Sequence, residues 1–562
     1  MNKTRIMSLL LALAMMLTLV ACGGNNNAND SANNSGNDSS QSGGDEVVVD
    51  KSVTIAMTGD VNTWNPWYYN EIVANSIQRH VFDPLVDVDS NMQLIPCLAT
   101  EWSTPDNGAT WEFKLREGVT FHNGNAFNAD DVVYSYERCI ALAKGWADAT
   151  ASIASVEKVD DYTVKFTCNG IDAILPASVK NIMIMDKETT EGLDDTQLDD
   201  PANVAGTGRY ALKEYVRDDH TSLEVFANYW GEKPEAEKVT IRAIPNDGTR
   251  TASLIGQEVD MVMNVPVTDV AVLETKDYLN IVSGPSIGVM FYNMAQTEED
   301  PSKDAAMPLK SPDGSNPLNV RDVRLAIALA INTEELIDKL QNGYAIVAPT
   351  CVPEGFNGYN PNLKDYGYDP AEAEKLLDAA GYPRQADGYR FEITMDCTND
   401  RYINDAATAQ AIAGYLDKVG IKCNVNAMSR SVFFSYVRIH DETDNTHFYQ
   451  AGWSEPSGES VLLARDLLYG TTLQGRVKEN MGGANRGYYN NAKVNELIDK
   501  AMATADAAER DEIMQEVWQI AYDDVAMMTT FFTCDVYAVN ERVAYTPRAD
   551  QMIYAWNFSF PA

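Results

Sequence analysis

Two glutamates near a tryptophan are the residues of this chain whose types and spacing most suggest chemistry. Glu455 and Glu459 lie in the stretch AGWSEPSGESVLL, which contains no basic residue. Such acids could form a catalytic pair, receive a ligand's positive charge, or belong to an ordinary turn after a strand. Glycoside hydrolysis needs two carboxylates on opposing walls of a cleft, whereas this pair falls inside one short loop. A secreted hydrolase is therefore the least favoured alternative.

Two other features that could indicate catalysis, a G-x-S-x-G motif and the histidines, lack the context that catalysis requires. The sequence Gly284-Pro285-Ser286-Ile287-Gly288 matches the G-x-S-x-G nucleophile elbow, but an elbow needs a helix directly after the serine, and here a strand-like run continues. The five histidines are widely dispersed, which weakens any scheme of acid and base catalysis built on histidine. We therefore expect a protein that is not an enzyme and has no catalytic residues.

The segment from His440 to His447 is the best candidate for a metal site. Two imidazoles and three carboxylates could supply nitrogen and oxygen ligands, but their spacing fits no defined site, and such a polar run is usually a solvated loop. The sequence has no Walker-type phosphate loop. We expect no cofactor, and His440 and His447 stay an alternative as metal ligands.

The charge balance limits the partners of this protein. Its 562 residues include 82 acidic and 43 basic ones, which gives a formal net charge of −39. Nucleic acids and anionic membrane surfaces bind proteins through Lys and Arg, so the composition argues against both. The length and the 45% hydrophobic content predict a large core divided between two or three folding units.

The N-terminal segment has the pattern of an export signal. Lys3 and Arg5 precede the apolar residues 9–20, and Leu19-Val20-Ala21-Cys22 closes the segment with small residues before a cysteine. These last four residues resemble the bacterial lipobox, which implies a signal peptide over residues 1–21, cleavage before Cys22 and lipidation of its thiol. An ordinary secretory signal with an incidental cysteine is the alternative.

Residues 22–50 contain too few hydrophobic side chains to fold, and we expect this Gly/Ser/Asn-rich segment to be a flexible tether. No later run of about 18 apolar residues offers a second membrane anchor. The expected location is the outside of the cytoplasmic membrane, at the cell surface or in the periplasm, with only the lipid in the membrane. Seven further cysteines form no CxxC pair, and their odd number leaves at least one thiol without an intramolecular partner.

After the tether, β-rich runs alternate with helical patterns. Strands are expected at residues 53–57, 109–117, 162–168 and 238–244, and helical regions at residues 320–340, 369–381, 404–420 and 491–522. The second of these helical regions is well delimited: Asp369-Pro370-Ala371-Glu372 supplies an N-cap, a proline at the first helical position and a capping-box acid. The mixture predicts an α/β or α+β fold.

A longer pattern resembles a known family. Residues 98–138, LATEWSTPDNGATWEFKLREGVTFHNGNAFNADDVVYSYER, closely resemble the signature of the bacterial extracellular solute-binding proteins, which include oligopeptide-, dipeptide- and nickel-binding lipoproteins of ABC importers. The motifs VAGTGRYALKEY, NYWGEKPEAEKVTIRAI, LIGQEVDMV, NPLNVRDVRLAIALAIN, YDPAEAEKLLDAAGY and GYLDKVGIKC follow in the family's order. The resemblance covers essentially all of residues 53–562.

This resemblance implies an α/β, two-lobed fold like that of periplasmic binding proteins. Lobe I would comprise residues 51–287 and 530–562, with an extra subdomain inserted at about residues 90–200, and lobe II would comprise residues 288–529. Two segments, near Gly288 and Thr529, would cross between the lobes and form a hinge around the ligand. We expect a monomer.

The resemblance also implies a ligand site. In peptide-binding relatives, an acid shortly after a Gly-Trp pair receives the ligand's ammonium, and here that pair is Gly452-Trp453. The acid that corresponds best is Glu455, with Glu459 as the alternative, although relatives usually carry aspartate at the position that Pro456 occupies in this chain.

Further contacts are implied on both lobes. Arg401 stands before a second-lobe helix, where relatives have the arginine that receives the ligand's carboxylate. Tyr402 and Trp453 would line the cleft, and Thr58-Gly59-Asp60 resembles the first-lobe stretch that contacts the ligand backbone.

The expected function is that of a lipid-anchored receptor which captures short peptides and delivers them to an ABC permease. A receptor for nickel, a metal chelate or another non-peptide solute is the alternative, because this fold accepts all of these.

Overall fold

The computed structural model describes residues 50–303, 307–437 and 446–561, and these belong to one compact unit, Asp50–Ala562. The predictions for the signal peptide, for Cys22, for nearly all of the tether and for His440 lie outside the described residues. In the described part of the chain, no helix combines the length and the apolarity needed to cross a bilayer. The seven cysteines found there are all free thiols.

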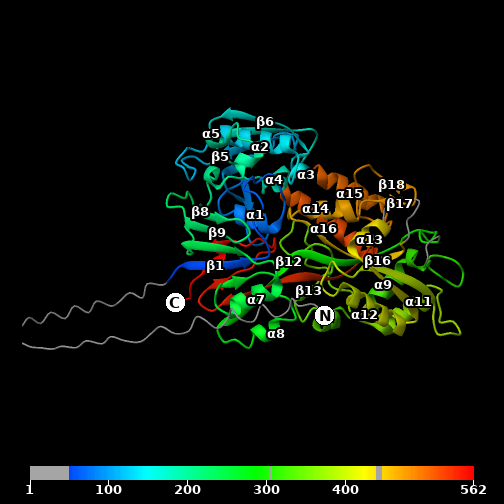
Figure 1. Cartoon of the computed structure of the whole chain (residues 1–562). Coiled ribbons are helices and arrows are strands. Elements are labelled where there is room, and N and C mark those ends of the chain that lie inside the picture. Colours follow the sequence, from blue (N-terminus) through cyan, green and yellow to red (C-terminus); the bar gives the residue numbers. More distant parts are fainter. Residues whose placement is uncertain (1–49, 304–306, 438–445, 562) are drawn as a thin grey trace, which may run out of the picture. The chain divides into compact units, whose positions relative to one another are not determined.

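One large mixed sheet runs through the described residues (Figure 1). Its strand order is β15-β14-β16-β12-β19-β11-β1-β10-β9-β8, and β13 pairs with β19. The strands are β1 (Ser52–Met57), β8 (Tyr210–Val216), β9 (His220–Val225), β10 (Lys238–Ala243), β11 (Met261–Val262), β12 (Leu279–Met294), β13 (Ala345–Val347), β14 (Phe391–Thr398), β15 (Ile421–Met428), β16 (Phe448–Ser454) and β19 (Met528–Asn540). The runs VTIAM and KVTIRAI are confirmed as strands, and β1 and β10 pair in parallel.

The two longest strands, β12 and β19, connect two groups of elements. Residues 279–285 of β12 pair with residues 534–540 of β19, and residues 289–292 pair with residues 528–532 of the same strand. On its other side, β12 pairs through residues 288–294 with β16. The register between the two strands shifts between Pro285 and Val289, which marks a local irregularity where the chain passes from one group to the other. This pair of strands is the double crossing that the two-lobed fold requires. The residue boundaries of the lobes stay a prediction.

A smaller antiparallel sheet occupies part of the predicted insertion at about residues 90–200. Its order is β4 (Ala99–Ser103), β5 (Thr110–Leu115), β7 (Thr163–Cys168) and β6 (Ile153–Asp160), and α2 (Ala129–Leu142) packs on β6 and β7. The ring of Phe166 contacts Phe113 and Tyr136 edge-on, with centroid distances of 5.1 and 4.8 Å. Aromatic burial therefore joins this sheet to its helix.

The helical predictions were right in place, but the regions expected at residues 320–340 and 491–522 are each divided into two helices. The expected helix at residues 369–381 is α11 (Pro370–Ala379), and the Asp369 side chain accepts a hydrogen bond from the Glu372 backbone N–H at 2.9 Å. The helical region expected at residues 320–340 is instead two helices, α9 (Arg321–Leu329) and α10 (Thr333–Leu340). Asn332 caps the second helix, because its side chain accepts from the Glu335 N–H at 3.1 Å.

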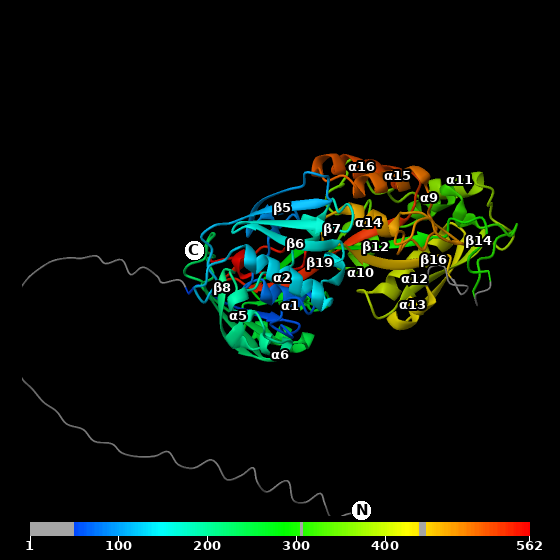
Figure 2. The ribbon, with the colours of Figure 1, turned by 90° about the horizontal axis from the view of Figure 1, so that it is seen from above.

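Further helices complete the unit, and α15 and α16 lie side by side in Figure 2. They are α1 (Ile72–Gln78), α3 (Ala147–Thr150), α4 (Leu175–Val179), α5 (Lys187–Thr190), α6 (Asp195–Leu198), α7 (Asp247–Ile255), α8 (Val270–Leu273), α12 (Asp405–Lys418), α13 (Arg430–Tyr436), α14 (Ser460–Leu467), α15 (Ala492–Met502) and α16 (Ala507–Asp523). Short elements are η1 (Pro201–Asn203), η2 (Pro317–Asn319), η3 (Ala555–Asn557), β2 (Val86–Val88), β3 (Leu94–Pro96), β17 (Thr471–Thr472), β18 (Gly475–Arg476), β20 (Ala544–Tyr545) and β21 (Phe558–Ser559).

Separate hydrophobic cores lie on the two sides of the crossing strands. One contains Trp64, Trp67 and the aromatic residues of the small sheet, and another is built around Trp518 and the helices α14 to α16. A third lies under α9, α11 and α12. Each group of elements thus has a buried interior, and Val88, Met92 and Ile174 of the first group also pack into the core around Trp518. Distinct interiors are a condition for two lobes to move relative to each other about the strands between them.

Candidate functional site

A cavity of about 370 Å³ lies beside the two crossing strands, and we call it the Arg401 cavity. It is lined by residues 288–290 of β12, Thr533 of β19, Arg401, Tyr402 and residues 452–454 at the end of β16. It therefore brings together Arg401, Tyr402, Gly452 and Trp453, which the sequence predicts as ligand contacts, although these residues come from segments about 50 positions apart.

Tyr402 lines this cavity and is held against β16 by hydrogen bonds. Its hydroxyl accepts a hydrogen bond from the Gly452 N–H at 2.9 Å and donates to the Gly452 carbonyl at 3.3 Å. A Cβ on residue 452 would come within 2.8 Å of the Tyr402 ring and 3.1 Å of the Met290 sulfur. The glycine of the Gly-Trp pair is thus required by packing, because only a residue without a side chain lets the tyrosine lie against the strand.

The Arg401 guanidinium stands at the cavity with its charge uncompensated. Its Nε donates to the Tyr402 hydroxyl at 2.7 Å, and the group lies over the rings of Tyr402 and Phe434, at 5.1 and 4.9 Å from their centroids. These contacts hold the exposed side chain in place without neutralising it. Among the described residues, no carboxylate forms an ion pair with Arg401. Such a guanidinium can receive an anionic group from a ligand.

Trp453 offers a second unused group. Its indole N–H is buried and, within the described part of the chain, no acceptor pairs with it. An unpaired buried donor costs free energy, and a ligand carbonyl or carboxylate would relieve that cost.

Glu455 lies at a different cavity, of about 500 Å³, which we call the Lys180 cavity. Its carboxylate accepts from the Ser457 N–H at 3.0 Å. Burial raises the pKa of Glu455, while the hydrogen bonds from Ser457 and the nearby charge of Arg465 lower it. Both Lys180 and Arg465 line the same cavity. Glu455 thus stands among cations that the protein itself supplies.

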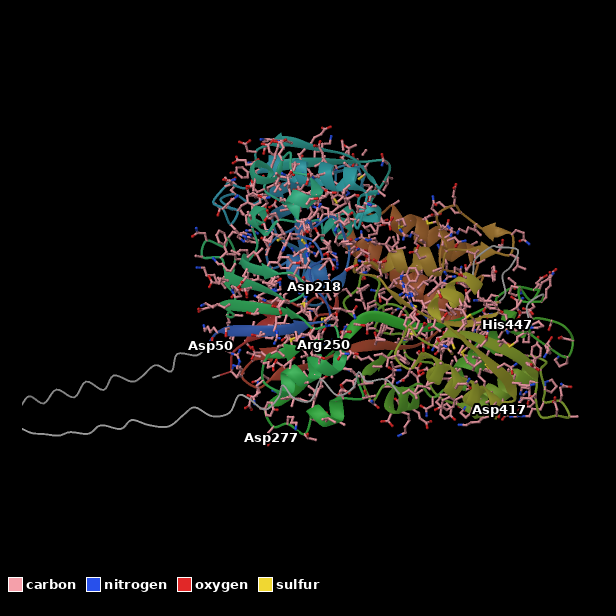
Figure 3. All side chains as sticks on the ribbon, in the orientation of Figure 1. Asp50, Asp218, Arg250, Asp277, Asp417 and His447 are labelled. Carbon is pink, nitrogen blue, oxygen red and sulfur yellow. The ribbon has the colours of Figure 1, made fainter. Side chains whose placement is uncertain are left out.

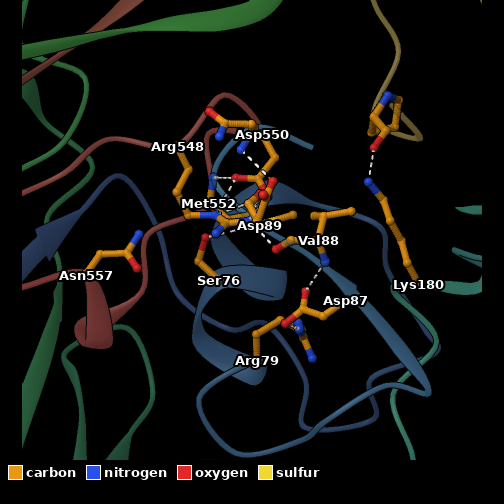
Figure 4. A network of polar contacts seen from close by, with 12 residues as sticks. Ser76, Arg79, Asp87, Val88, Asp89, Lys180, Arg548, Asp550, Met552 and Asn557 are labelled. Atoms are coloured by element: carbon orange, nitrogen blue, oxygen red, sulfur yellow. Dashed lines mark hydrogen bonds and ion pairs between the residues drawn. The ribbon is translucent and has the colours of Figure 1, made fainter. Parts of the chain in front are cut away.

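Lys180 links the elements on the two sides of that cavity. In Figure 4 its ammonium donates to the Pro456 carbonyl, in the loop that also contains Glu455. Burial lowers the pKa of Lys180 to about 8, and the charges of Asp550, Asp87 and Glu455 oppose that effect.

Next to it, a buried ionic network joins β2 to the C-terminal segment (Figure 4). Arg79 pairs with Asp87 at 2.6 Å, and Arg548 pairs with Asp550 at 2.7 Å and donates to the Val88 carbonyl at 3.2 Å. Because these charges are mutually satisfied, we interpret the network as structural.

Glu459 is held in a buried ion pair. The Arg510 guanidinium donates to its two carboxylate oxygens at 2.9 and 2.5 Å, and both side chains are less than a tenth exposed. Arg510 also donates to the Thr504 and Ala505 carbonyls. This bidentate pair connects the start of α14 to α16. The Glu459 carboxylate, which the sequence predicts as the alternative receptor for the ligand's ammonium, is therefore already paired with Arg510.

Thr58, Gly59 and Asp60 follow β1, as predicted. They differ in whether their polar groups are free to contact a ligand. Asp60 is buried, and its carboxylate accepts from the Tyr215 hydroxyl at 2.9 Å and from the Asp218 and Val61 N–H groups at 2.8 and 2.7 Å. It therefore holds the loops of β1 and β8 together. Thr58 instead lines a third cavity.

This third cavity, of about 640 Å³, is the Asp535 cavity. It is lined by Thr58, residues 264–268, Ile403 and Asn404, residues 534–536 of β19, and Asp247 and Gln551. Asp535 is not among the ligand contacts that the sequence predicts. The available signal was a lone carboxylate inside TTFFTCDVYAVN, a segment assigned to a crossing strand and otherwise nearly free of charge.

His447, which is labelled in Figure 3, has hydrogen-bond partners at both of its ring nitrogens. Its Nε2 accepts from the Thr394 N–H at 2.8 Å, and its Nδ1 bonds the Ser302 hydroxyl at 2.7 Å. Burial lowers the pKa of His447 to about 4, although the charge of Asp300 raises it. Among the described residues, no group of three or more His, Cys, Asp or Glu side chains could hold a metal ion.

The family model for the bacterial extracellular solute-binding proteins, family 5 Middle, matches residues 93–475. This chain therefore belongs to that family. The glutathione-binding protein GsiB of Shigella boydii serotype 4 is 26% identical to it over 483 residues, which cover 84% of this chain and 87% of that protein.

Solved structures share the fold. The structure of HbpA2 from Haemophilus parasuis matches with a TM-score of 0.77 at 22% identity and covers 91% of this chain and all of the other. A nickel ABC transporter structure from Bacillus halodurans matches with a TM-score of 0.73 at 19% identity, over 90% of this chain and 100% of that one. The two-lobed fold of periplasmic binding proteins and the α/β class are thereby confirmed.

Proposed function

We propose that this protein is an extracytoplasmic, lipid-anchored receptor that captures short peptides between its lobes and delivers them to an ABC permease. The observation that carries the proposal is the Arg401 guanidinium, which lacks a carboxylate partner among the described residues and faces a cavity beside the crossing strands. A peptide's terminal carboxylate matches such a guanidinium in charge and in its two-pronged hydrogen-bonding geometry.

The surroundings of Arg401 also suit a peptide. Residues 288–290 and 452–454 of two neighbouring strands line the cavity, and Tyr402 and Trp453 add aromatic side chains to it. A ligand backbone can use the polar groups while its side chains pack on the aromatic rings. The relative from Shigella boydii is named for glutathione, which is itself a small peptide with free carboxylates.

Release to a permease needs two states of the receptor. Separate cores on the two sides of β12 and β19 allow rigid-body closure about these strands, and a ligand that contacts both sides favours the closed state by its differential affinity. Arg401 comes from the β14–α12 connection and Thr58 from the loop after β1, so the two cavities beside the hinge offer contacts on both sides.

A metal chelate is the second candidate, because a solved neighbour is a nickel transporter protein and a chelate brings its own metal ligands. Such a ligand would need only an anion receptor from this protein, and Arg401 could serve as one.

Ligand screening of the full chain, purified in detergent, tests the proposal. Trialanine, glutathione, nickel ion and a nickel–histidine chelate would each be added during thermal unfolding. A ligand at 100 times its dissociation constant raises the free energy of unfolding by about 2.7 kcal/mol. We expect stabilisation by the peptides. Stabilisation by nickel or its chelate, with no response to any peptide, would replace the proposal by the second candidate.

A further inference from the structure

At two places in the chain, consecutive residues line the Arg401 cavity and the Asp535 cavity. Thr533 lines the Arg401 cavity and Cys534 lines the Asp535 cavity. Likewise, Tyr402 lines the Arg401 cavity and Ile403 lines the Asp535 cavity. Thr533 and Asp535 are two positions apart on β19, so the alternation of a strand directs both side chains to the same face, roughly 6.6 Å apart along the strand.

The two cavities carry opposite charges. Arg401 is the only charged residue among those described as lining its cavity, whereas the Asp535 cavity contains Asp247 and Asp535 and, among the described residues that line it, no Lys or Arg. Asp247 is compensated, because the Arg250 guanidinium, labelled in Figure 3, pairs with it at 2.7 Å. Asp535 is therefore the uncompensated acid.

Asp535 has a single neutral partner. The side-chain amide of Gln551 donates to its two carboxylate oxygens, at 2.9 Å each, and no ion pair to Asp535 is found within the described residues. Gln551 adopts a backbone φ of 64°, in the left-handed region that side chains other than Asn and Asp rarely occupy, so its position is held at a conformational cost. Burial raises the pKa of Asp535 to about 6, and the Gln551 hydrogen bonds lower it. A cation beside this carboxylate would relieve the cost of burying its charge.

We propose that Asp535 receives the ammonium group of a dipolar ligand whose carboxylate is bound by Arg401, so that the ligand lies along β19 at the hinge. This rests on the proposed function and replaces Glu455 in the role of ammonium receptor. Glu455 shares its cavity with Lys180 and Arg465, and also with the acids Asp148 and Asp172, so the protein itself already supplies cations beside it. The described residues that line the Asp535 cavity include no Lys or Arg, so the Asp535 carboxylate has no cation there.

The placement has a consequence for selectivity. A ligand with both an ammonium and a carboxylate satisfies both uncompensated charges, whereas a ligand without the ammonium leaves the half-buried Asp535 unpaired and one without the carboxylate leaves Arg401 unpaired. Zwitterionic solutes such as free peptides should therefore bind more tightly than N-blocked or amidated forms of the same molecule.

Isothermal titration calorimetry of the full chain tests the assignment with three probes: trialanine, N-acetyl-trialanine and trialanine amide. Wild-type protein should bind trialanine about 10- to 100-fold more tightly than its N-acetyl form. In Asp535→Asn, which keeps the shape of the side chain, this ratio should fall to near one. Asp535→Glu should retain the preference, and Glu455→Gln should behave as wild type.

The amide probe separates a local effect from a damaged cleft. Asp535→Asn should still discriminate between trialanine and its amide, because that preference depends on Arg401, and its thermal unfolding should stay cooperative. If Asp535→Asn fails to fold, Asp535→Glu and Glu455→Gln still decide between the two acids. A preference for the free ammonium that persists in Asp535→Asn, or that is lost in Glu455→Gln, would overturn the assignment while leaving the peptide receptor intact. Failure of wild-type protein to bind any peptide would overturn the proposed function, and this inference with it.

Discussion

The hydroxyl of Tyr402 hydrogen-bonds both backbone groups of Gly452, accepting from its N–H at 2.9 Å and donating to its carbonyl at 3.3 Å, while it also accepts from Arg401. One oxygen thus uses its single proton and both lone pairs. It connects the segment before α12 to the end of β16, and it orients the guanidinium that we assign to the ligand's carboxylate.

Replacing Tyr402 by phenylalanine tests this connection. The variant leaves the Gly452 N–H without its partner and frees the Arg401 side chain, so the free energy of unfolding should fall by about 1 to 3 kcal/mol and trialanine affinity should also fall. Urea unfolding and calorimetry measure the two effects. Tyr389→Phe removes a surface hydroxyl that bonds Asp417 at 2.8 Å, and it should change neither quantity by more than about 0.5 kcal/mol. Equal behaviour of the two variants would contradict the proposed connection.

Glu459→Gln separates a structural acid from a ligand receptor. Removal of this charge leaves the Arg510 guanidinium buried and unpaired, which should lower the free energy of unfolding by about 3 to 5 kcal/mol. The matched control is Glu509→Gln, since Glu509 pairs with Lys500 at 3.2 Å on the surface and should contribute at most about 1 kcal/mol. A Glu459→Gln protein of wild-type stability with lost peptide binding would show instead that Glu459 faces the ligand.

The stability of the ligand-free protein should carry a pH signature of Asp535. Burial raises the pKa of Asp535 in the folded protein from its ordinary value of 3.8 to about 6, so its contribution to stability is full below about pH 4 and is lost as the pH rises through 6. A shift of about two units corresponds to at most about 3 kcal/mol. Cys534 and the ion-paired Asp247 are the other titratable groups lining that cavity.

Asp535→Asn should remove this loss of stability. The free energy of unfolding of the variant, relative to that of wild type, should therefore be higher at pH 7 than at pH 4. Denaturant unfolding at both pH values gives the comparison. A difference between variant and wild type that is independent of pH would contradict the raised pKa.

Much of the fold could be predicted from local pattern. The strand periods of β1, β5, β7 and β10 and the Asp369 cap of α11 are confirmed, because each depends on residues close in sequence. The break between α9 and α10 was missed, since the apolar spacing continues across Asn332, whose side chain instead caps a second helix.

The site could be predicted only in part. The resemblance placed Arg401, Tyr402, Gly452 and Trp453, and one cavity unites them. Glu455 follows Trp453 by two positions but lines another cavity, and proximity in sequence gives no sign of that separation. The Asp535 carboxylate depends on Gln551 and on the partner strand β12, so its surroundings exist only in the folded chain.

The affinity of Arg401→Gln for trialanine and for trialanine amide, measured by calorimetry beside wild-type protein, tests the central claim most directly. Arg476→Gln is the control, because Arg476 is an exposed arginine that lines neither the Arg401 nor the Asp535 cavity. Wild-type protein and the control should prefer the free carboxylate about 10- to 100-fold, and Arg401→Gln should bind both peptides equally and weakly. Retention of the wild-type preference in Arg401→Gln would contradict the assignment of this cavity as the peptide site.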